Sequence, residues 1–390
     1  MKKTWINISD VLFFQEGPGV RNTQYTTEGV KLLNVANLVD GKVDLSTSDR
    51  YISEDEAYGK YKHFLCDAGD FIIASSGIKV EYIDKKMGFI DESMLPLCMN
   101  TSTIRFKVLD DNQLRIRYFM YYLKSQHFKN QLFKQITGSA QLNYGPSHLK
   151  KMIMPLINLS KQDESIACMD KVQSIIERRQ QELVKLDTLI KARFVEMFGD
   201  PVENPNGYYV ATLQELIDKG YITYHLDGNH GGDYPRSEEF VDSGIPYISA
   251  NCIVNGEIDF SKAKYLTSER ASKLRKGIAR DDDVLFAHNA TVGPTVVLHT
   301  VEEKVILGTS LTAYRCNKEK IMPNYLKTYM MSDGFVRQYS GGMKQTTRNQ
   351  VPITVQKKYL FLIPPIKEQN QFADFVHQVD KSKVTVQKGY

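Results

Sequence analysis

Two glycine-led loops in this 390-residue chain carry side-chain types that can read nucleic-acid bases. Amide side chains can bond adenine at two points, and arginine or lysine can do the same to guanine. The later loop offers both kinds, whereas the earlier loop is uncharged and would read by neutral hydrogen bonds. A solvated polar loop has the same composition, and only its place in the repeat described below favours function. The predicted base-reading residues are Lys344, Gln345, Thr347, Arg348 and Asn349 in the later loop, and Ser139, Gln141, Asn143 and Tyr144 in the earlier one.

Two further pairs of polar loops are candidates for contact with DNA. Small polar residues after a strand can also simply end that strand, so the structural alternative stays open. No second metal ligand stands at ligand spacing from His230, and we therefore predict no metal site. The first pair of loops holds Ser75, Ser76 and Lys79, with Asn289 and Thr291 in the later copy, and the second pair holds Arg21 and Asn22, with Asn229 and His230.

Signatures of an enzyme are weak in this sequence. The Asn/Asp-Pro-Pro-aromatic tetrapeptide of an amino-methyltransferase is absent, as is a G-x-x-x-x-G-K-[ST] nucleotide loop. A loose nuclease-like pattern, a carboxylate followed by an acid-x-lysine triplet, occurs twice and could hold Mg²⁺ near a phosphate. A Mg²⁺-dependent DNA endonuclease therefore stays open as an alternative. The residues of the pattern are Asp283, Glu302 and Lys304, and in the first copy Asp70, Asp84 and Lys86.

The elements that must position these candidates occur twice in the chain. The segment GVKLLNVANLVDGKVDL at residues 29–45 returns as GIPYISANCIVNGEIDF at 244–260. In the same way NTSTIRFKV at 100–108 returns as GTSLTAYRC at 308–316. Asp-Gly and Asn-Gly in the first pair predict two-residue hairpin turns. The chain therefore reads as an internal repeat.

The repeat predicts an α+β protein with the order domain, helix, domain, helix. Two similar domains are separated by long helices, and a pseudo-twofold relation should connect the two copies. The predicted bounds are residues 1–157 for the first domain, 158–201 for the central helix, 208–365 for the second domain and 366–390 for a shorter C-terminal helix.

The central helix should be one continuous element, with Ser160 as its N-cap and Gly199 as a left-handed stop. Apolar residues recur along it every seven positions. A seam that regular predicts a partner helix, so the two spacer helices should form an antiparallel coiled coil. The heptad residues are Met169, Ile176, Leu183, Ile190 and Met197.

A cluster near the end of the central helix, Phe194, Met197 and Phe198, is larger than a two-helix seam requires. It is predicted to dock a partner protein. Packing against the second domain explains it equally well.

Composition limits the class of protein. Apolar residues make up 42% of the chain and charged residues 25%, as in a water-soluble globular protein. The net charge of +4 permits local DNA-binding patches but does not argue for them. Five scattered cysteines, with no apolar run long enough for a signal peptide or a membrane span, predict a cytoplasmic protein.

Four stretches carry a resemblance to a known family. They are LIKARFVEMFGDP at 189–201, IPPIKEQNQFA at 363–373, DGNHGGDYP at 227–235 and GPGVRN at 17–22. With the order domain, helix, domain, helix, the chain resembles the specificity subunit of Type I restriction–modification systems.

The resemblance implies a subunit without catalysis of its own. Each target-recognition domain would read one half of a bipartite sequence in double-stranded DNA, and the antiparallel helices would fix the gap. Two modification subunits would methylate adenine with S-adenosylmethionine, and restriction subunits would use ATP and Mg²⁺, so this chain would bind no cofactor. A coiled-coil scaffold without catalysis is the other alternative, although it leaves two divergent domains unexplained.

Overall fold

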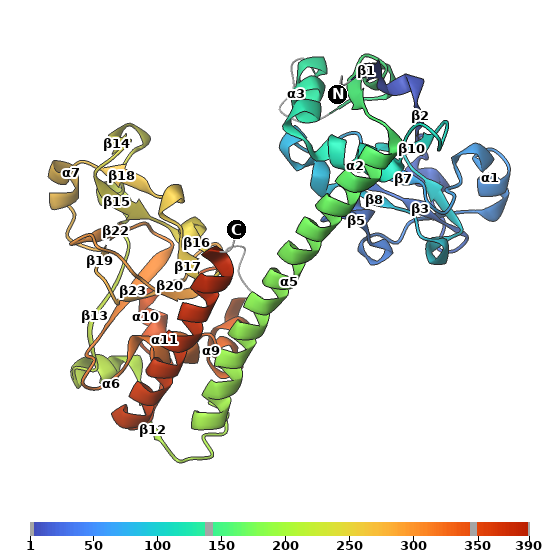
Figure 1. The fold of residues 1–390 in the computed structure, drawn as a ribbon. Helices are drawn as coiled ribbons and strands as arrows, with labels where there is room; N and C mark the ends of the chain where they lie inside the picture. The colour runs from blue at the N-terminus through green and yellow to red at the C-terminus, as the bar shows by residue number, and fades with distance from the viewer. Residues whose placement is uncertain (1–3, 137–142, 344–348, 389–390) are drawn as a thin grey trace. The chain divides into compact units, whose positions relative to one another are not determined.

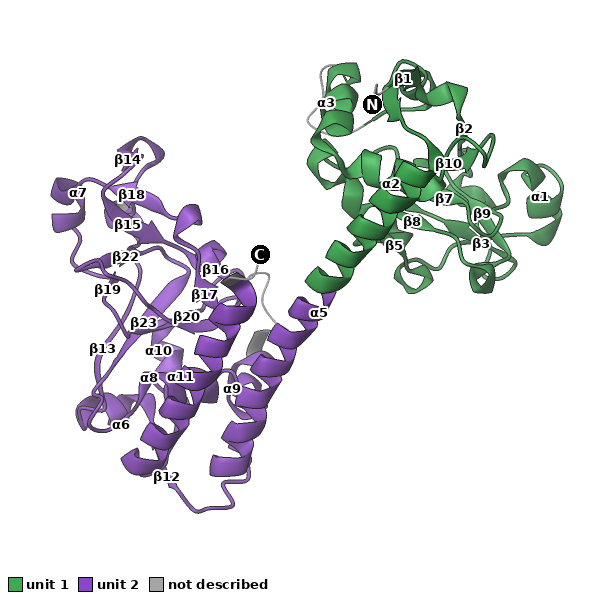
Figure 2. Cartoon of the chain, in the orientation of Figure 1, with its two compact units in different colours: residues 1–176 green, residues 177–390 purple. Residues whose placement is uncertain are grey.

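The computed structural model describes residues 4–136, 143–343 and 349–388 (Figure 1). These residues form two compact units, residues 1–176 and 177–390 (Figure 2). The boundary falls inside the long helix α5, so this helix contributes one end to each unit.

The first unit is built on a four-stranded antiparallel sheet with the order β2-β10-β7-β8. A three-stranded sheet, β6-β3-β9, and two small ribbons, β4-β5 and β1-β11, complete it. Its strands are β1 (Thr4–Asn7), β2 (Leu12–Glu16), β3 (Val30–Leu33), β4 (Leu38–Val39), β5 (Lys42–Val43), β6 (Tyr51–Ile52), β7 (Phe71–Ala74), β8 (Met87–Phe89), β9 (Leu97–Met99), β10 (Thr103–Val108) and β11 (Ile153–Leu156), and its helices are α1 (Glu54–Tyr58), α2 (Ile116–Lys124), α3 (Gln126–Gln135), α4 (Pro146–Leu149) and the start of α5 (Leu159–Phe198).

The second unit repeats this plan with a four-stranded antiparallel sheet in the order β13-β23-β20-β21. Its second sheet has five strands, in the order β14-β18-β15-β22-β19. The strands are β12 (Tyr209–Thr212), β13 (Ile222–Asp227), β14 (Phe240–Val241), β15 (Ile245–Ile248), β16 (Ile253–Val254), β17 (Glu257–Ile258), β18 (Lys264–Leu266), β19 (Ile278–Ala279), β20 (Val284–Ala287), β21 (Thr295–Val297), β22 (Val305–Leu307), β23 (Leu311–Cys316) and β24 (Leu360–Ile363), and the helices are α6 (Leu213–Asp218), α7 (Ser268–Ser272), α8 (Pro323–Met330), α9 (Asp333–Met343), α10 (Ile353–Gln356) and α11 (Ile366–Lys388).

The predicted internal repeat is confirmed down to single hydrogen bonds. The Tyr122 hydroxyl donates to the Ile153 carbonyl at 2.7 Å, and the Tyr329 hydroxyl donates to the Leu360 carbonyl at 3.0 Å. In each unit this bond ties the first helix after the main sheet to the strand that closes the domain. Two different surfaces are therefore carried on one framework.

Both predicted hairpins are also confirmed. Asp40 and Gly41 have φ of 47° and 79° between β4 and β5, and Asn255 and Gly256 have φ of 51° and 80° between β16 and β17. Positive φ at both central residues is the turn that matches strand twist, and Asn, Asp and Gly reach it at least cost.

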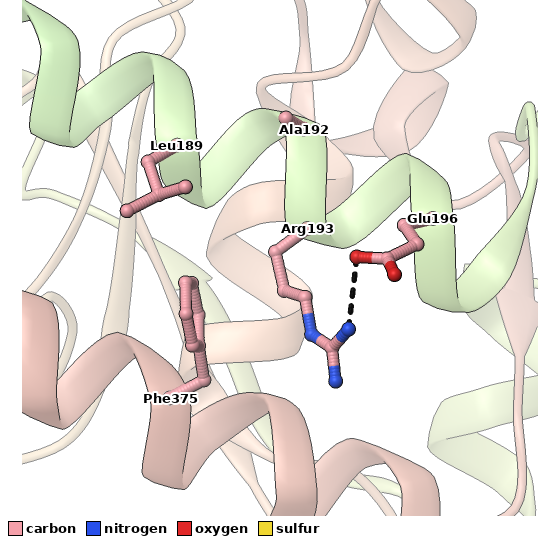
Figure 3. Close-up of a pocket in the computed structure, with 5 residues that line it drawn as sticks. All are labelled: Leu189, Ala192, Arg193, Glu196 and Phe375. Atoms are coloured by element: carbon pink, nitrogen blue, oxygen red, sulfur yellow. Dashed lines mark hydrogen bonds and ion pairs between the residues drawn. The ribbon is translucent and has the colours of Figure 1, made fainter.

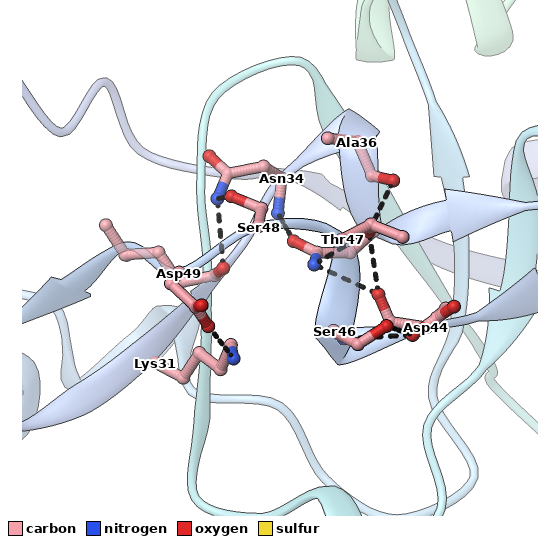
Figure 4. A network of polar contacts seen from close by, with 10 residues as sticks. Lys31, Asn34, Ala36, Asp44, Ser46, Thr47, Ser48 and Asp49 are labelled. Carbon is pink, nitrogen blue, oxygen red and sulfur yellow. Dashed lines mark hydrogen bonds and ion pairs between the residues drawn. The ribbon is translucent and has the colours of Figure 1, made fainter. Parts of the chain in front are cut away.

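A polar network supports the hairpin of the first unit (Figure 4). The Asn34 backbone N–H donates to Asn37 Oδ1 at 2.9 Å, and Asn37 Nδ2 donates to the Asp44 carbonyl at 3.1 Å. The Thr47 hydroxyl donates to the Ala36 carbonyl at 2.8 Å. Because Asn37 is fully buried, these bonds satisfy polar groups that would otherwise be costly to bury.

The ends of α5 follow the sequence only in part. Gly199 has φ of 76° and ends the helix as predicted. The predicted N-cap, Ser160, is wrong, because Asn158 caps the helix with its side-chain oxygen 3.0 Å from the Lys161 N–H. Asn158 is among the strongest N-cap types, and an N-cap two residues earlier leaves Ser160 inside the helix.

A buried glutamine in the first turns fixes each spacer helix to its own domain. Gln162 Oε1 accepts from the Arg115 N–H at 2.8 Å, and its Nε2 donates to the Gln113 carbonyl at 2.8 Å. Gln369 repeats the pattern: its Oε1 accepts from the Met322 N–H at 2.9 Å, and its Nε2 donates to the Lys320 carbonyl at 3.4 Å. Both side chains are fully buried, so the starts of α5 and α11 are held rigidly.

Within the second unit, α11 lies beside the last part of α5, and Figure 3 shows Phe375 of α11 next to Leu189 and Arg193 of α5. Asp187 pairs with Lys383 at 2.7 Å, and the Arg193 guanidinium lies 5.9 Å from the Phe375 ring. An earlier residue of α5 therefore contacts a later residue of α11, so the two helices run antiparallel. Ile190 and Met197 pack against the core of the unit. Coiled-coil packing along the whole predicted seam stays a prediction.

Among the described residues, apolar side chains in the early part of α5 stay exposed. In the first unit, Met169 and Val172 are 43% and 45% exposed. None of the helices in the described ranges combines the length and the hydropathy needed to cross a membrane.

Candidate nucleic-acid interface

One edge of the main sheet gathers several predicted site loops in the first unit. Strand β2 ends at Glu16, β7 ends at Ala74 and β10 begins at Thr103, and register places these three ends together. The loops that follow therefore meet at this edge. We define the first loop edge as Glu16, Ser75, Ser76, Ser102 and Asn143.

A short hydrogen-bonded frame holds the first loop edge. The Ser75 N–H donates to the Ser102 carbonyl at 2.8 Å, and the Tyr144 N–H donates to the Ser75 carbonyl at 3.0 Å. Ser76 and Asn143 pair as an isolated β-bridge. Gly77 then turns the chain with φ of 75°.

The second unit builds the same frame with different side chains. The His288 N–H donates to the Ser310 carbonyl at 3.0 Å, and the Val351 N–H donates to the His288 carbonyl at 2.8 Å. Asn289 pairs with Gln350 as an isolated bridge, and Ala290 takes the left-handed turn with φ of 65°. We define the second loop edge as Asp227, His288, Asn289, Ser310 and Gln350.

A glycine brings a third segment to the first edge. The Gly17 N–H donates to the Thr103 carbonyl at 2.8 Å, and a Cβ on Gly17 would lie 2.0 Å from the Asn100 carbonyl oxygen. Only glycine fits that approach. The segment carrying Arg21 and Asn22 therefore starts at the first loop edge, and both of these side chains are exposed.

Three of the residues predicted to contact DNA are wrong, because their side chains are buried. Tyr144 is 2% exposed and donates its hydroxyl to the Ala74 carbonyl at 2.9 Å, and burial raises the pKa of Tyr144 well above its usual value. Ser75 and Asn229 are each 1% exposed, and Asn229 Nδ2 donates to the Lys276 carbonyl at 2.9 Å. These residues shape the loops and do not present donors or acceptors to DNA.

The other predicted residues in the described ranges lie at the surface and stay candidates. Ser76 is half-buried and donates its hydroxyl to Ser102 Oγ at 2.7 Å, which leaves its lone pairs for a ligand. The remaining candidates are Arg21, Asn22, Lys79 and Asn143 in the first unit, and His230, Asn289, Thr291 and Asn349 in the second.

Six predicted residues lie outside the described residues. They are Ser139 and Gln141 in the earlier loop, and Lys344, Gln345, Thr347 and Arg348 in the later one. The described residues that flank them, Asn143 and Asn349, lie at the first and second loop edges.

Sequence reasoning missed Glu16, Ser102 and Gln350. Each is placed at its edge by a strand end or by a bridge to another loop. Gln350 follows the predicted residue Asn349, so its amide side chain could have been identified from the sequence. Glu16 and Ser102 become visible only once strand register is known.

Each edge carries one carboxylate, and the two edges differ in their other hydrogen-bonding groups. Asp227 Oδ2 lies 2.6 Å from His230 Nε2 at the second edge. Burial lowers the pKa of His288 to about 4, so this imidazole is neutral at pH 7. At the first edge, Glu16 accepts from the Ser75 hydroxyl at 3.3 Å. Carboxylates can accept a hydrogen bond from the cytosine amino group but repel phosphate, so phosphate contacts must come from basic residues such as Lys79 and Arg21.

Acid should weaken the second unit before it weakens the first. Burial lowers the pKa of both His225 and His288 to about 4, against 6.5 in the unfolded chain. The unfolded chain therefore binds more protons, and stability falls as pH drops from about 6.5 towards 4, by up to about 3 kcal/mol per histidine. Pulse proteolysis of the full chain at pH 7 and pH 5, which resolves the units by fragment size, measures this loss.

A variant that carries the first unit's residues at these positions, His225→Phe with His288→Ser, serves as the control. It should lose much less stability between pH 7 and pH 5. An equal loss in the variant would contradict the assignment of the acid sensitivity to these two side chains.

The prediction that Phe194 and Phe198 dock a partner protein is also wrong. Phe194 is 2% exposed and Phe198 is fully buried, and both rings pack against Tyr325 and Phe372. Met197 is half-buried and packs against the same core. The cluster anchors α5 to the second domain and is not free to dock a partner.

The nuclease-like carboxylates serve ion pairs instead. Asp283 is buried and its two oxygens each lie 2.8 Å from the Arg315 guanidinium. Asp70 is likewise buried and lies 3.4 Å from Arg105. Removing a buried partner of this kind is costly, and a carboxylate held by arginine has few lone pairs left for Mg²⁺. The repeated pattern therefore has a structural explanation.

Comparisons with known proteins agree on one family. Residues 23–186 and 208–389 match the family described as Type I restriction modification DNA specificity domain. The specificity subunit of the Type I restriction enzyme MjaVIII of Methanocaldococcus jannaschii is 23% identical over 336 residues, which cover 82% of this chain and 74% of that protein.

Two solved structures share the fold. The S subunit of a Type I restriction–modification system from M. genitalium aligns with a TM-score of 0.51 at 17% identity, covering 100% of this chain and 92% of that one. A chain from a structure of complex assembly and conformational transition in the type I R-M system aligns with a TM-score of 0.50 at 15% identity, covering 99% and 92%.

Proposed function

This chain belongs to the Type I restriction modification DNA specificity family and is a specificity subunit of a Type I restriction–modification system, and on that premise we propose that each unit reads one half of a bipartite DNA target. The readers are the first and second loop edges. Subunits of this family act with DNA and with other subunits of the restriction–modification system.

One observation carries this proposal: the two loop edges have the same backbone hydrogen bonds but different side chains. Ser76 and Asn143 occupy the bridge of the first edge, and Asn289 and Gln350 occupy the bridge of the second. One backbone geometry therefore offers two different patterns of donors and acceptors. Two patterns select two different short sequences, because base edges in the major groove are distinguished by such patterns. A plain scaffold would leave this divergence unexplained.

Helix α5 has the properties of a spacer. It is continuous over 40 residues, or about 60 Å at about 1.5 Å per residue. The Gln162 hydrogen bonds fix its start to one domain, and the buried Phe198 fixes its end to the other. Half-sites one helical turn apart, roughly 34 Å, present their grooves on the same face of the duplex, and a helix of this length can set such an interval.

The finer assignment of partners follows from the family. We assign two modification subunits, which bring S-adenosylmethionine, and restriction subunits, which bring ATP and Mg²⁺. This chain would supply recognition and no catalysis, and its own residues would bind none of these cofactors. The assembly would act on double-stranded DNA in the cytoplasm.

Replacing Asn289 with alanine should relax selectivity at one base position in one half of the target. A bidentate base contact is worth about 1–3 kcal/mol, and the other half of the target should stay unchanged. The measurement is the methylated sequence, mapped by sequencing DNA from cells that coexpress this chain with its modification subunit.

Asn370→Ala on α11 is the matched control, because Asn370 is exposed in the same unit but lies on a different surface. It should leave the methylated sequence unchanged. A uniform loss of methylation across all sequences in Asn289→Ala would reassign this residue to phosphate contact. No change would remove it from the interface.

A further inference from the structure

A buried polar column lies directly behind the second loop edge. We define it as His225, Thr312, Tyr314 and Gln356, each 8% exposed or less. The Tyr314 hydroxyl donates to Gln356 Oε1 at 2.6 Å, and His225 Nε2 lies 3.1 Å from the same oxygen. Gln356 Nε2 donates to Thr312 Oγ1 at 3.1 Å, and that hydroxyl bonds His288 Nδ1 at 2.9 Å.

The first unit has apolar side chains at all of these places. Phe14 pairs with Phe106 in the register that His225 and Tyr314 share, and Ile104 occupies the position of Thr312. Leu149 is the last residue of α4, as Gln356 is of α10. The first-unit counterparts of the column are Phe14, Ile104, Phe106 and Leu149, of which the last three are fully buried. The same framework is therefore stable without the column.

Stability does not account for the column. A buried polar network rarely adds stability over apolar packing of similar volume, and its partly satisfied groups are costly. His225 Nδ1 is buried without a hydrogen-bond partner among the described residues. What a polar network supplies is a fixed position for the groups that it bonds.

The bonds of the column end at the second loop edge. Gln356 Nε2 also donates to the Val351 carbonyl at 3.0 Å, and Val351 follows Gln350. In the first unit, the counterpart of Val351 is Tyr144, whose hydroxyl holds the loop through the Ala74 carbonyl at 2.9 Å. Valine has no hydroxyl. The bond from Gln356 therefore replaces, in the second unit, the anchor that Tyr144 supplies in the first.

We propose that His225, Thr312, Tyr314 and Gln356 are positioning residues that set the base selectivity of the second loop edge. Gln356 holds residues 349–351, and Thr312 fixes the orientation of His288, next to Asn289. The column does not touch DNA and acts through these residues. This inference rests on the proposed function, because it assigns the edge to recognition of one half of the target.

Gln356→Leu, which copies Leu149, is the first test, with methylated sequences mapped as for Asn289→Ala. The variant should lose selectivity by about tenfold or more in the half read by the second unit, and the other half should stay unchanged. Its melting temperature should fall, because the Tyr314 hydroxyl and His225 Nε2 lose the side chain that both of them contact and stay buried, so selectivity is mapped at a temperature where the variant is folded. Adding Val351→Tyr, which imports the Tyr144 anchor, should restore most of the selectivity.

If Gln356→Leu does not fold, Thr312→Val replaces it in the test. Thr312→Val removes only the hydroxyl that links Gln356 to His288. Tyr325→Phe is the matched control: Tyr325 is 1% exposed in the same unit, and its hydroxyl donates to the Leu362 carbonyl at 2.8 Å, outside the column. It should leave both halves of the methylated sequence unchanged.

Three outcomes would overturn the positioning role. In the first, Gln356→Leu or Thr312→Val folds and keeps its selectivity, whereas Asn289→Ala loses selectivity. That outcome would leave the proposed function intact. Another is a loss that Val351→Tyr does not reduce. The last is unchanged selectivity in the column variants and in Asn289→Ala together, which would also remove the second loop edge from recognition.

Discussion

Replacing Phe198 with alanine should destabilise the second unit by about 3–5 kcal/mol, the cost of emptying a buried aromatic site. The Phe198 ring is fully buried, with its centroid 5.0 Å from that of Phe194, 4.9 Å from that of Tyr325 and 5.6 Å from that of Phe372. Because these rings belong to three helices, the loss should loosen the attachment of α5 and α11 to their domain. Chemical denaturation followed by pulse proteolysis measures the change.

Val195→Ala provides the matched control on the same helix. Val195 is 54% exposed, and its truncation should cost well under 1 kcal/mol. Equal losses in the two variants would contradict the burial of Phe198. If Phe198→Ala instead kept full stability but lost a partner subunit, the original docking interpretation of the cluster would be right after all.

Inserting four residues in α5 beside Glu182 should lengthen the gap in the methylated sequence by two base pairs. The insertion adds about 6 Å and rotates the following unit by about 40° beyond a full turn. Two more base pairs add about 7 Å and rotate the second half-site by about 70°. Forcing the variant onto the original gap would require deformed DNA, so binding there should fall on the order of tenfold or more.

A two-residue insertion at the same place is the sharper control. It adds only about 3 Å but turns the unit by about 200°, which faces its loop edge away from the groove. This variant should bind neither the original gap nor a gap one base pair longer. Unchanged spacing in the four-residue variant would show that α5 does not set the interval.

Local chemistry explains what the sequence predicted well. Asp40-Gly41 and Asn255-Gly256 take the φ values that their turn type demands, and Gly199 takes the left-handed stop. These outcomes depend on residues close together in the chain. The repeat was readable for a similar reason, since each copy keeps the spacing of its turns and strands.

Side-chain burial was the part that the sequence could not supply. Tyr144 and Phe198 look like exposed functional residues in a loop and at a helix end, but partners distant in the chain, Ala74 and Tyr325, enclose them. Ser160 and Asn158 are both good N-caps, and the docking of Gln162 chooses between them. Glu16 came to its edge only through strand pairing with β10.

In each domain the entering and the leaving strands are neighbours. Thr4 pairs with Leu156 where the first domain closes onto α5, and Tyr209 pairs with Ile363 where the second closes onto α11. A domain tied off in this way is a closed loop of chain, and its interior can be cut and rejoined elsewhere without altering the two strands that hold it. Circular permutation of either domain is therefore geometrically permitted. For the same reason, recombination at two adjacent points can exchange a whole domain, so a chain of this design can acquire a new target sequence while its two long helices stay unchanged.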